Sequence, residues 1–204
     1  MCLGVNKIQT HTQKVSGTSR FVLHLLFFIK REMNSFPWVT LSLAGILVIV
    51  YFLTKGSKVD CSSSPKAQVE RTFRHADTRH LVNNLFGLAI LVKFEALVGS
   101  ALFLGGMVLI FLLTQLLEPI VRAITNYPCS VGFSGVILGG LVWSIGDDPS
   151  LIYKILSIAT FSAIMPNISF WGHIIGIFAG AITYFALGSL QKNPNKLQRA
   201  EKVQ

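Results

Sequence analysis

Four polar side chains stand at matched positions near the beginnings of three apolar runs. His80 and Asn84 lie in the first turns of one run. Ser134 lies six residues into a second run, and His173 lies four residues into a third. Polar groups inside a bilayer are costly and generally face a cavity or a partner. A hydroxyl, an amide and two imidazoles at similar depth therefore form a candidate reactive site.

These side chains are sufficient for acyl transfer. A serine hydroxyl needs a base to take its proton, and an imidazole is the usual base. We therefore predict that Ser134 is the nucleophile and that His173 is the base. The oxyanion of the tetrahedral intermediate needs hydrogen-bond donors, for which we predict Asn84 and His80. Because no Asp or Glu is placed to orient His173, the pattern predicts a dyad.

Long uncharged runs must position these residues. The chain has 204 residues, of which 51% are hydrophobic and only 13% are charged, which favours a membrane protein over a soluble domain. Six runs approach the ~20 residues that cross a bilayer. They lie at about 36–54, 80–97, 101–124, 128–145, 150–165 and 169–190. We therefore predict an all-α membrane protein with a bundle of six transmembrane helices.

The alternation of six crossings brings the candidate site together. The second, fourth and sixth runs enter the bilayer from the same face, so their first turns lie within roughly 10 Å of that surface at ~1.5 Å per residue. Small residues favour close packing of the fourth run, at Gly135 and Gly139, against the sixth, at Gly176 and Gly180. This packing would bring the predicted nucleophile to the predicted base.

Simpler roles are open for each polar residue. Ser134 could serve only as a small residue that lets two helices pack closely, and Asn84 could make a structural hydrogen bond between helices. His173 could be a buried polar residue whose hydrogen bonds are satisfied within the fold. His80 could be a histidine that lies at the level of the lipid headgroups without a catalytic role. The grouping of these residues on three helices favours the catalytic interpretation for Ser134 and His173.

The rest of the chain divides into three predicted regions. We expect a basic N-terminal extension at 1–35 that is either interfacial or a targeting segment, a membrane domain at 36–190, and a basic tail at 191–204. The net charge of +9 lies mostly in the tails and one loop, which favours anionic headgroups over nucleic acid. The three cysteines are scattered without a CxxC pair, so we predict neither a disulfide framework nor a zinc site. We predict no metal and no cofactor.

Three segments in this order resemble the rhomboid family of intramembrane serine proteases: FRHADTRHLVNNLFGL, GFSG and GHIIGIFAG. The resemblance covers about residues 73–188. It implies a six-helix core, with Ser134 as nucleophile and His173 as base, and with His80 and Asn84 at the oxyanion. It also implies structural support from His75, Glu95 and Gly132. The family's Trp-Arg pair of the first loop is absent, and Leu138 stands where many members have a tyrosine.

The resemblance also implies partners and a place for the site. The substrate would be another membrane protein, whose transmembrane segment frays near the non-cytoplasmic face of the bilayer. The protein would be multi-pass, with its active site toward that face. One rival is a non-catalytic rhomboid-like protein that binds or escorts transmembrane clients. A second rival is a small transporter, against which the runs show no charged pathway and no clear inverted repeat.

Overall fold

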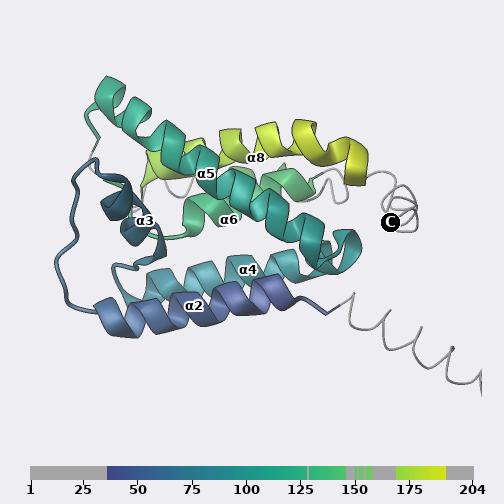
Figure 1. Ribbon diagram of the computed structural model, residues 1–204, viewed down its shortest axis with the longest axis horizontal. Helices are drawn as coiled ribbons and strands as arrows, with labels where there is room; N and C mark the ends of the chain where they lie inside the picture. The colour runs from purple at the N-terminus through teal and green to yellow at the C-terminus, as the bar shows by residue number, and fades with distance from the viewer. Residues whose placement is uncertain are drawn as a thin grey trace, which may run out of the picture. The chain divides into compact units, whose positions relative to one another are not determined.

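The computed structural model describes residues 36–127, 129–145, 150, 152–153, 155–157 and 169–191, and all regular structure in these ranges is helical. The helices are α2 (Trp38–Thr54), α3 (Pro65–Phe73), α4 (Thr78–Val98), α5 (Ser100–Thr125), α6 (Ser134–Ser144) and α8 (Phe170–Gln191), as Figure 1 shows. The predicted N-terminal extension and nearly all of the predicted C-terminal tail lie outside the described residues, so the predicted division of the chain stays a prediction.

Within the described residues, three helical segments are long and apolar enough to cross a membrane. They are Thr78–Val98, Ser100–Thr125 and Phe170–Gly188. Two further apolar helices are shorter, Trp38–Thr54 and Ser134–Ser144. Most of the predicted fifth run lies outside the described residues. The structure thus agrees with an all-helical membrane protein, while the number of six crossings stays a prediction.

The outward faces of these helices are apolar. Large hydrophobic side chains with more than two thirds of their surface exposed are Phe52, Leu53, Phe86, Tyr153, Ile124 and Phe185. A soluble protein rarely exposes such residues over several helices, whereas lipid solvates them well. The inward faces pack around Trp143 of α6, which is fully buried against Phe94 and Phe103.

The fourth predicted run is wrong at its beginning. It was expected to start at Pro128, but α6 starts at Ser134. Gly132 has a φ of +108°, which is outside the helical region and is accessible mainly to glycine. The chain therefore enters α6 through a non-helical connection, and Ser134 is the first residue of the helix instead of lying six residues inside it.

The connection from α2 to α4, expected only as a loop, contains the helix α3. Its start carries a local signal, because Ser64 precedes Pro65 and the Ser64 hydroxyl accepts a hydrogen bond from the Ala67 N–H at 3.3 Å. Serine before a helix and proline at its first position both favour initiation. Helix α3 lies at the same end of the molecule as the N-terminal ends of α4, α6 and α8 (Figure 1).

Glycines set the contact between α6 and α8. A Cβ atom on Gly176 would lie 2.1 Å from the carbonyl oxygen of Gly135, and one on Gly180 would lie 2.2 Å from that of Gly139. Neither position has room for any side chain. The two backbones therefore touch, as small residues allow in membrane helices.

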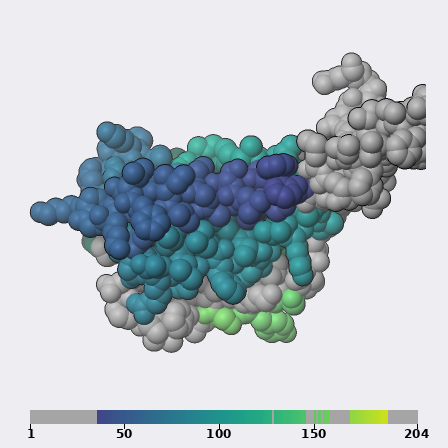
Figure 2. All heavy atoms as spheres, turned by 90° about the horizontal axis from the view of Figure 1, so that it is seen from below, coloured from purple at the N-terminus to yellow at the C-terminus, as the bar shows by residue number. Residues whose placement is uncertain are grey.

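Helix α2 lies along α4 (Figure 2). Hydrogen bonds to Glu95 of α4 hold it there. The fully buried Glu95 carboxylate accepts hydrogen bonds from the backbone N–H groups of Val39 and Thr40, each at 2.8 Å. It also accepts from the hydroxyls of Thr40 and Ser100, each at 2.6 Å. Because α2 has no side-chain cap of its own, Glu95 satisfies the free N–H groups of its first turn.

Candidate active site

Ser134 and His173 lie within hydrogen-bonding distance of each other. The Nε2 atom of His173 is 3.0 Å from the Oγ atom of Ser134. Ser134 opens α6, and His173 lies in the first turn of α8. The glycine contacts between these two helices start at the level of the pair, since a Cβ on Gly135 would lie 2.7 Å from the carbonyl oxygen of Gly172. Two residues 39 positions apart are thus brought together by helix packing.

The start of α6 offers hydrogen-bond donors beside the hydroxyl. The first backbone bond of this helix runs from the N–H of Ile137 to the carbonyl of Phe133. The N–H groups of Ser134, Gly135 and Val136 therefore precede the helical hydrogen-bond ladder, and the helix dipole places partial positive charge there. Sequence reasoning expected a backbone N–H at the oxyanion but could not name these donors, because it placed Ser134 inside the helix. The positive φ at Gly132 precedes the helix, so that these N–H groups lie at the start of α6.

His173 is buried, with 6% of its surface exposed. For Nε2 to accept a proton, the tautomer must carry its hydrogen on Nδ1. Among the described residues, Nδ1 has no hydrogen-bond partner. Leu138, at the position where the sequence suggested a missing aromatic, is buried in the core. The described surroundings of the imidazole therefore contain no carboxylate bonded to Nδ1.

His80 lies against the connection that leads to Ser134. A Cβ on Gly132 would be 2.5 Å from the Cε1 atom and 2.8 Å from the Nε2 atom of His80. The imidazole thus packs directly on the backbone two residues before the hydroxyl. Asn84 is buried one turn further along α4, where its Nδ2 donates to the His80 carbonyl at 3.0 Å. No hydrogen bond joins Asn84 to Ser134 or His173 in the part of the chain described.

His75 supports His80 from the loop between α3 and α4. Their rings are nearly perpendicular, with centroids 5.3 Å apart. Burial, and secondarily the charge of His80, lower the pKa of His75 to about 4. His75 is therefore neutral at physiological pH. Within the described residues, no group of three or more His, Cys, Asp and Glu side chains is arranged to hold a metal ion.

A buried ion pair lies behind the hydroxyl. Arg71 of α3 and Glu118 of α5 are 3.4 Å apart and almost fully buried. Arg71 also donates to the carbonyls of Asp60 and Ser62, and its own carbonyl accepts from the Gly132 N–H at 3.0 Å. Sequence analysis found no Trp-Arg pair and assigned Arg71 no role. The acidic residue inside an otherwise apolar run, Glu118, was the available signal that a buried cation lies opposite.

A cavity opens between this ion pair and the hydroxyl of Ser134. Polar side chains that line it come from α3, α5, the connection before α6, the start of α6 and the residue before α8: Thr72, Thr114, Gln115, Glu118, Ser130, Ser134 and Ser169. Water or a polar substrate group can therefore reach the first turn of α6 from this side.

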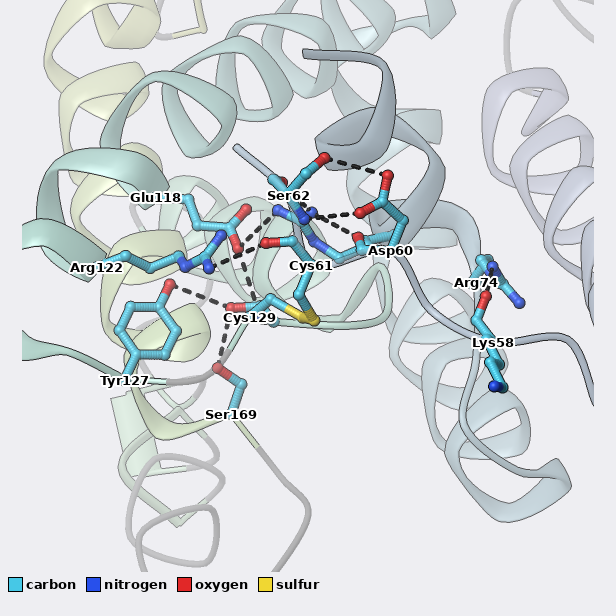
Figure 3. Close-up of a disulfide and its surroundings, with 12 residues drawn as sticks. Lys58, Asp60, Cys61, Ser62, Arg74, Glu118, Arg122, Tyr127, Cys129 and Ser169 are labelled. Atoms are coloured by element: carbon cyan, nitrogen blue, oxygen red, sulfur yellow. Dashed lines mark hydrogen bonds and ion pairs between the residues drawn. A yellow bond between two sulfur atoms is a disulfide. The ribbon is translucent and has the colours of Figure 1, made fainter. Parts of the chain in front are cut away.

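The expectation of no disulfide is wrong, because Cys61 and Cys129 are joined. Their Cα atoms are 5.5 Å apart, although 68 positions separate them in the chain. The bond links the segment before α3 to the segment before α6 (Figure 3). Cysteine spacing alone could not identify the pair, because only the fold brings these two loops to the same end of the molecule.

Comparison with known proteins identifies the family of the chain. No protein-family model matches the chain. Over 163 residues the chain is 31% identical to a protein of Acanthamoeba polyphaga mimivirus that is named as a "putative rhomboid protein". The match covers 76% of this chain and 93% of the viral protein. The chain is therefore an integral membrane protein, and it belongs to the rhomboid family.

Proposed function

We propose that the protein is an intramembrane serine endopeptidase that cleaves transmembrane segments of other membrane proteins. The single observation that carries this proposal is the distance of 3.0 Å between Nε2 of His173 and Oγ of Ser134. A nucleophile and its base need this separation for proton transfer. Membership of the rhomboid family agrees with the proposal, but it does not by itself distinguish an active member from an inactive one.

The geometry supports a two-step reaction. As Ser134 Oγ bonds to the peptide carbonyl carbon, its proton passes to Nε2 of His173, and the carbonyl oxygen takes the negative charge. The N–H groups at the start of α6 can stabilise this oxyanion, with His80 and Asn84 as further candidate donors. When the C–N bond breaks, His173 returns the proton to the leaving amine. A water molecule then attacks the acyl-enzyme and gives a proton to His173. As the acyl–Oγ bond breaks, His173 returns this proton to Ser134 Oγ and the carboxylic acid product is released.

The disulfide supports an orientation in the membrane. In the proposed six-helix topology, the dyad lies near the non-cytoplasmic face. Disulfides persist in oxidising compartments, and Cys61–Cys129 lies at the same end of the molecule as the dyad. This argument is independent of the charges of the loops. The bilayer and a transmembrane substrate are the partners that this arrangement requires.

Covalent labelling tests the proposal directly. A fluorophosphonate probe should label the wild-type protein in detergent, and it should not label Ser134→Ala. In reconstituted vesicles, Ser134→Ala and His173→Ala should each abolish cleavage of a membrane substrate while both variants still insert. A wild-type protein that binds transmembrane clients but neither labels nor cleaves them would instead establish the non-catalytic alternative.

A further inference from the structure

Two hydroxyl groups join the chain segments that lead into the nucleophile and the base. The Oγ atoms of Ser130 and Ser169 are 3.0 Å apart. Ser130 lies four residues before Ser134, and Ser169 lies four residues before His173. We refer to this hydrogen bond as the hydroxyl bridge. It connects the segments that precede α6 and α8, at the end where the dyad lies. It lies beyond the last glycine contact between the two helices.

On one side of the bridge, Ser169 fixes the first turn of α8. Its Oγ accepts a hydrogen bond from the N–H of Gly172 at 3.0 Å, which is the geometry of a serine N-cap. Its carbonyl accepts from the N–H of His173 at 3.2 Å. The position of the imidazole along α8 is thus set by the same residue that makes the bridge.

On the other side, Ser130 is anchored to α5. Its N–H donates to Glu118 at 3.3 Å, and its hydroxyl is 3.3 Å from that of Tyr127. Ser130 also follows directly on the disulfide-bonded Cys129. Figure 3 shows Tyr127, Cys129 and Ser169 gathered at this point. The bridge therefore connects the start of α8 to a segment before α6 that is itself held by hydrogen bonds and a disulfide.

The bridge requires a glycine beside it. A Cβ atom on Gly172 would lie 2.9 Å from the Oγ of Ser130 and 3.0 Å from the Oγ of Ser169. Both distances are closer than ordinary contacts of a methyl group. This gives a way to disturb the bridge without removing either hydroxyl.

The glycine contacts between α6 and α8 do not by themselves fix how far one helix lies along the axis of the other. At the glycines the two backbones touch with no side chain between them, so these contacts permit close approach without fixing the position of one helix along the other. A displacement of 1 Å between reacting groups can cost about 10²-fold in rate. We propose that Ser130 and Ser169 are positioning residues, whose hydroxyl bridge holds Ser134 and His173 at reacting distance. This inference rests on the proposed protease activity.

The test is a double-mutant cycle in reconstituted vesicles. Ser130→Ala and Ser169→Ala should each lower kcat by roughly 10- to 100-fold, with KM changed by less than about 2-fold. The double variant should be no slower than the slower single variant, because the two hydroxyls act as one unit. Ser169→Thr, which keeps a hydroxyl and a helix cap, should retain activity within a few-fold. Gly172→Ala should also lower kcat.

Two buried hydroxyls in the same helices serve as controls. Ser144 in α6 and Thr183 in α8 each donate to a carbonyl of their own helix, remote from the bridge. Ser144→Ala and Thr183→Ala should leave kcat within about 2-fold of wild type, since an alanine in place of either removes only a local bond. Thermal unfolding of all variants separates loss of positioning from loss of folded protein.

The outcomes separate the bridge from the protease itself. An unchanged kcat in Ser130→Ala, or effects of the two single variants that multiply in the double variant, would overturn the bridge while the wild type still cleaves. A Ser169→Thr variant as slow as Ser169→Ala would also overturn it. If the wild type neither reacts with a fluorophosphonate probe nor cleaves a substrate, the proposed function itself fails.

Discussion

The residue Gly132 controls both the direction of the chain into α6 and the position of an imidazole. Gly132→Ala would place a methyl group at a φ of +108° and 2.5 Å from His80. Strain of this kind costs of order 1–3 kcal/mol. We expect a lower thermal midpoint and slower fluorophosphonate labelling of Ser134, because the backbone at the start of α6 has to shift. Thermal unfolding and labelling rates in detergent measure both effects.

Gly105 provides the matched control. It lies in α5 with no atom within 4 Å of the Cβ position, so Gly105→Ala meets no neighbour. Alanine is the better helix former by roughly 0.5–1 kcal/mol, so this variant should be neutral or slightly stabilised. If Gly132→Ala behaves like Gly105→Ala, the close approach of His80 does not constrain the site.

His75 makes the stability of the protein depend on pH in a defined direction. Burial lowers the pKa of His75 to about 4, whereas an unfolded chain keeps it near 6.5. Between these values the unfolded state binds the proton and the folded state does not. The contribution of neutral His75 to the free energy of unfolding is therefore fully present above about pH 6.5, and it is lost as the pH falls toward 4.

Replacement of His75 by asparagine tests this assignment. The difference in thermal midpoint between pH 7.5 and pH 5 should be smaller for His75→Asn than for the wild type, since one proton-binding group of the unfolded state has been removed. Equal differences in the two proteins would show that His75 does not carry the effect.

At the scale of helices, Glu95 holds α2 against α4. Four hydrogen bonds reach its fully buried carboxylate, two of them from backbone N–H groups with no helical partner. Glu95→Ala should destabilise the protein by about 3 kcal/mol or more, because these donors lose a charged acceptor. At roughly 2–4 °C per kcal/mol, the thermal midpoint should fall by about 6–12 °C.

The same variant should spare the dyad in folded protein. Glu95 lies 15 residues from His80 along α4, or about 22 Å at 1.5 Å per residue. Fluorophosphonate labelling of Ser134 well below the midpoint should therefore match the wild type. Ser100→Ala, which removes only one of the four bonds, should cost about 1 kcal/mol. A midpoint unchanged by Glu95→Ala would contradict its role as the cap of α2.

The helices show which features a sequence can predict. The apolar runs located α2, α4, α5 and α8 to within a few residues, because hydropathy is a local property of consecutive side chains. The beginning of α6 was missed, since it depends on one backbone angle within an apolar run. The helix α3 was missed for another reason: its residues are mostly polar, and its signal was only the Ser64–Pro65 start.

The candidate site divides in the same way. Ser134 and His173 could be paired from parity and spacing, and the structure brings them to 3.0 Å. The Arg71–Glu118 ion pair, the Ser130–Ser169 bond and the Cys61–Cys129 disulfide could not be found in this way. Each joins segments that are 39 or more residues apart, and no periodic pattern marks either partner. Only the folded chain decides which of these groups meet.

For the molecule as a whole, the disulfide leads to two predictions, one about the stability of the protein and one about the side of the membrane on which the dyad lies. A bond between residues 68 positions apart should stabilise the protein by about 2–4 kcal/mol, since it restricts the unfolded chain. Reduction, or replacement of Cys61 and Cys129 by serine, should therefore lower the thermal midpoint. A paired replacement avoids leaving a free thiol that could form other bonds.

The orientation of the protein in the membrane can be measured by finding the side of a sealed vesicle from which reagents reach this disulfide. In a Cys2→Ser background, which removes the third cysteine, a reductant that cannot cross the bilayer should expose both thiols to a maleimide reagent only from the non-cytoplasmic side. The reason is that the bond lies at the dyad end and persists where the compartment is oxidising. Labelling of Cys61→Ser in the same Cys2→Ser background, in which Cys129 is a free thiol beside the connection to α6, locates that end without reduction. If the impermeant maleimide reacts with this thiol from the cytoplasmic side, the dyad faces the cytoplasm and substrates must present their cleavage sites there.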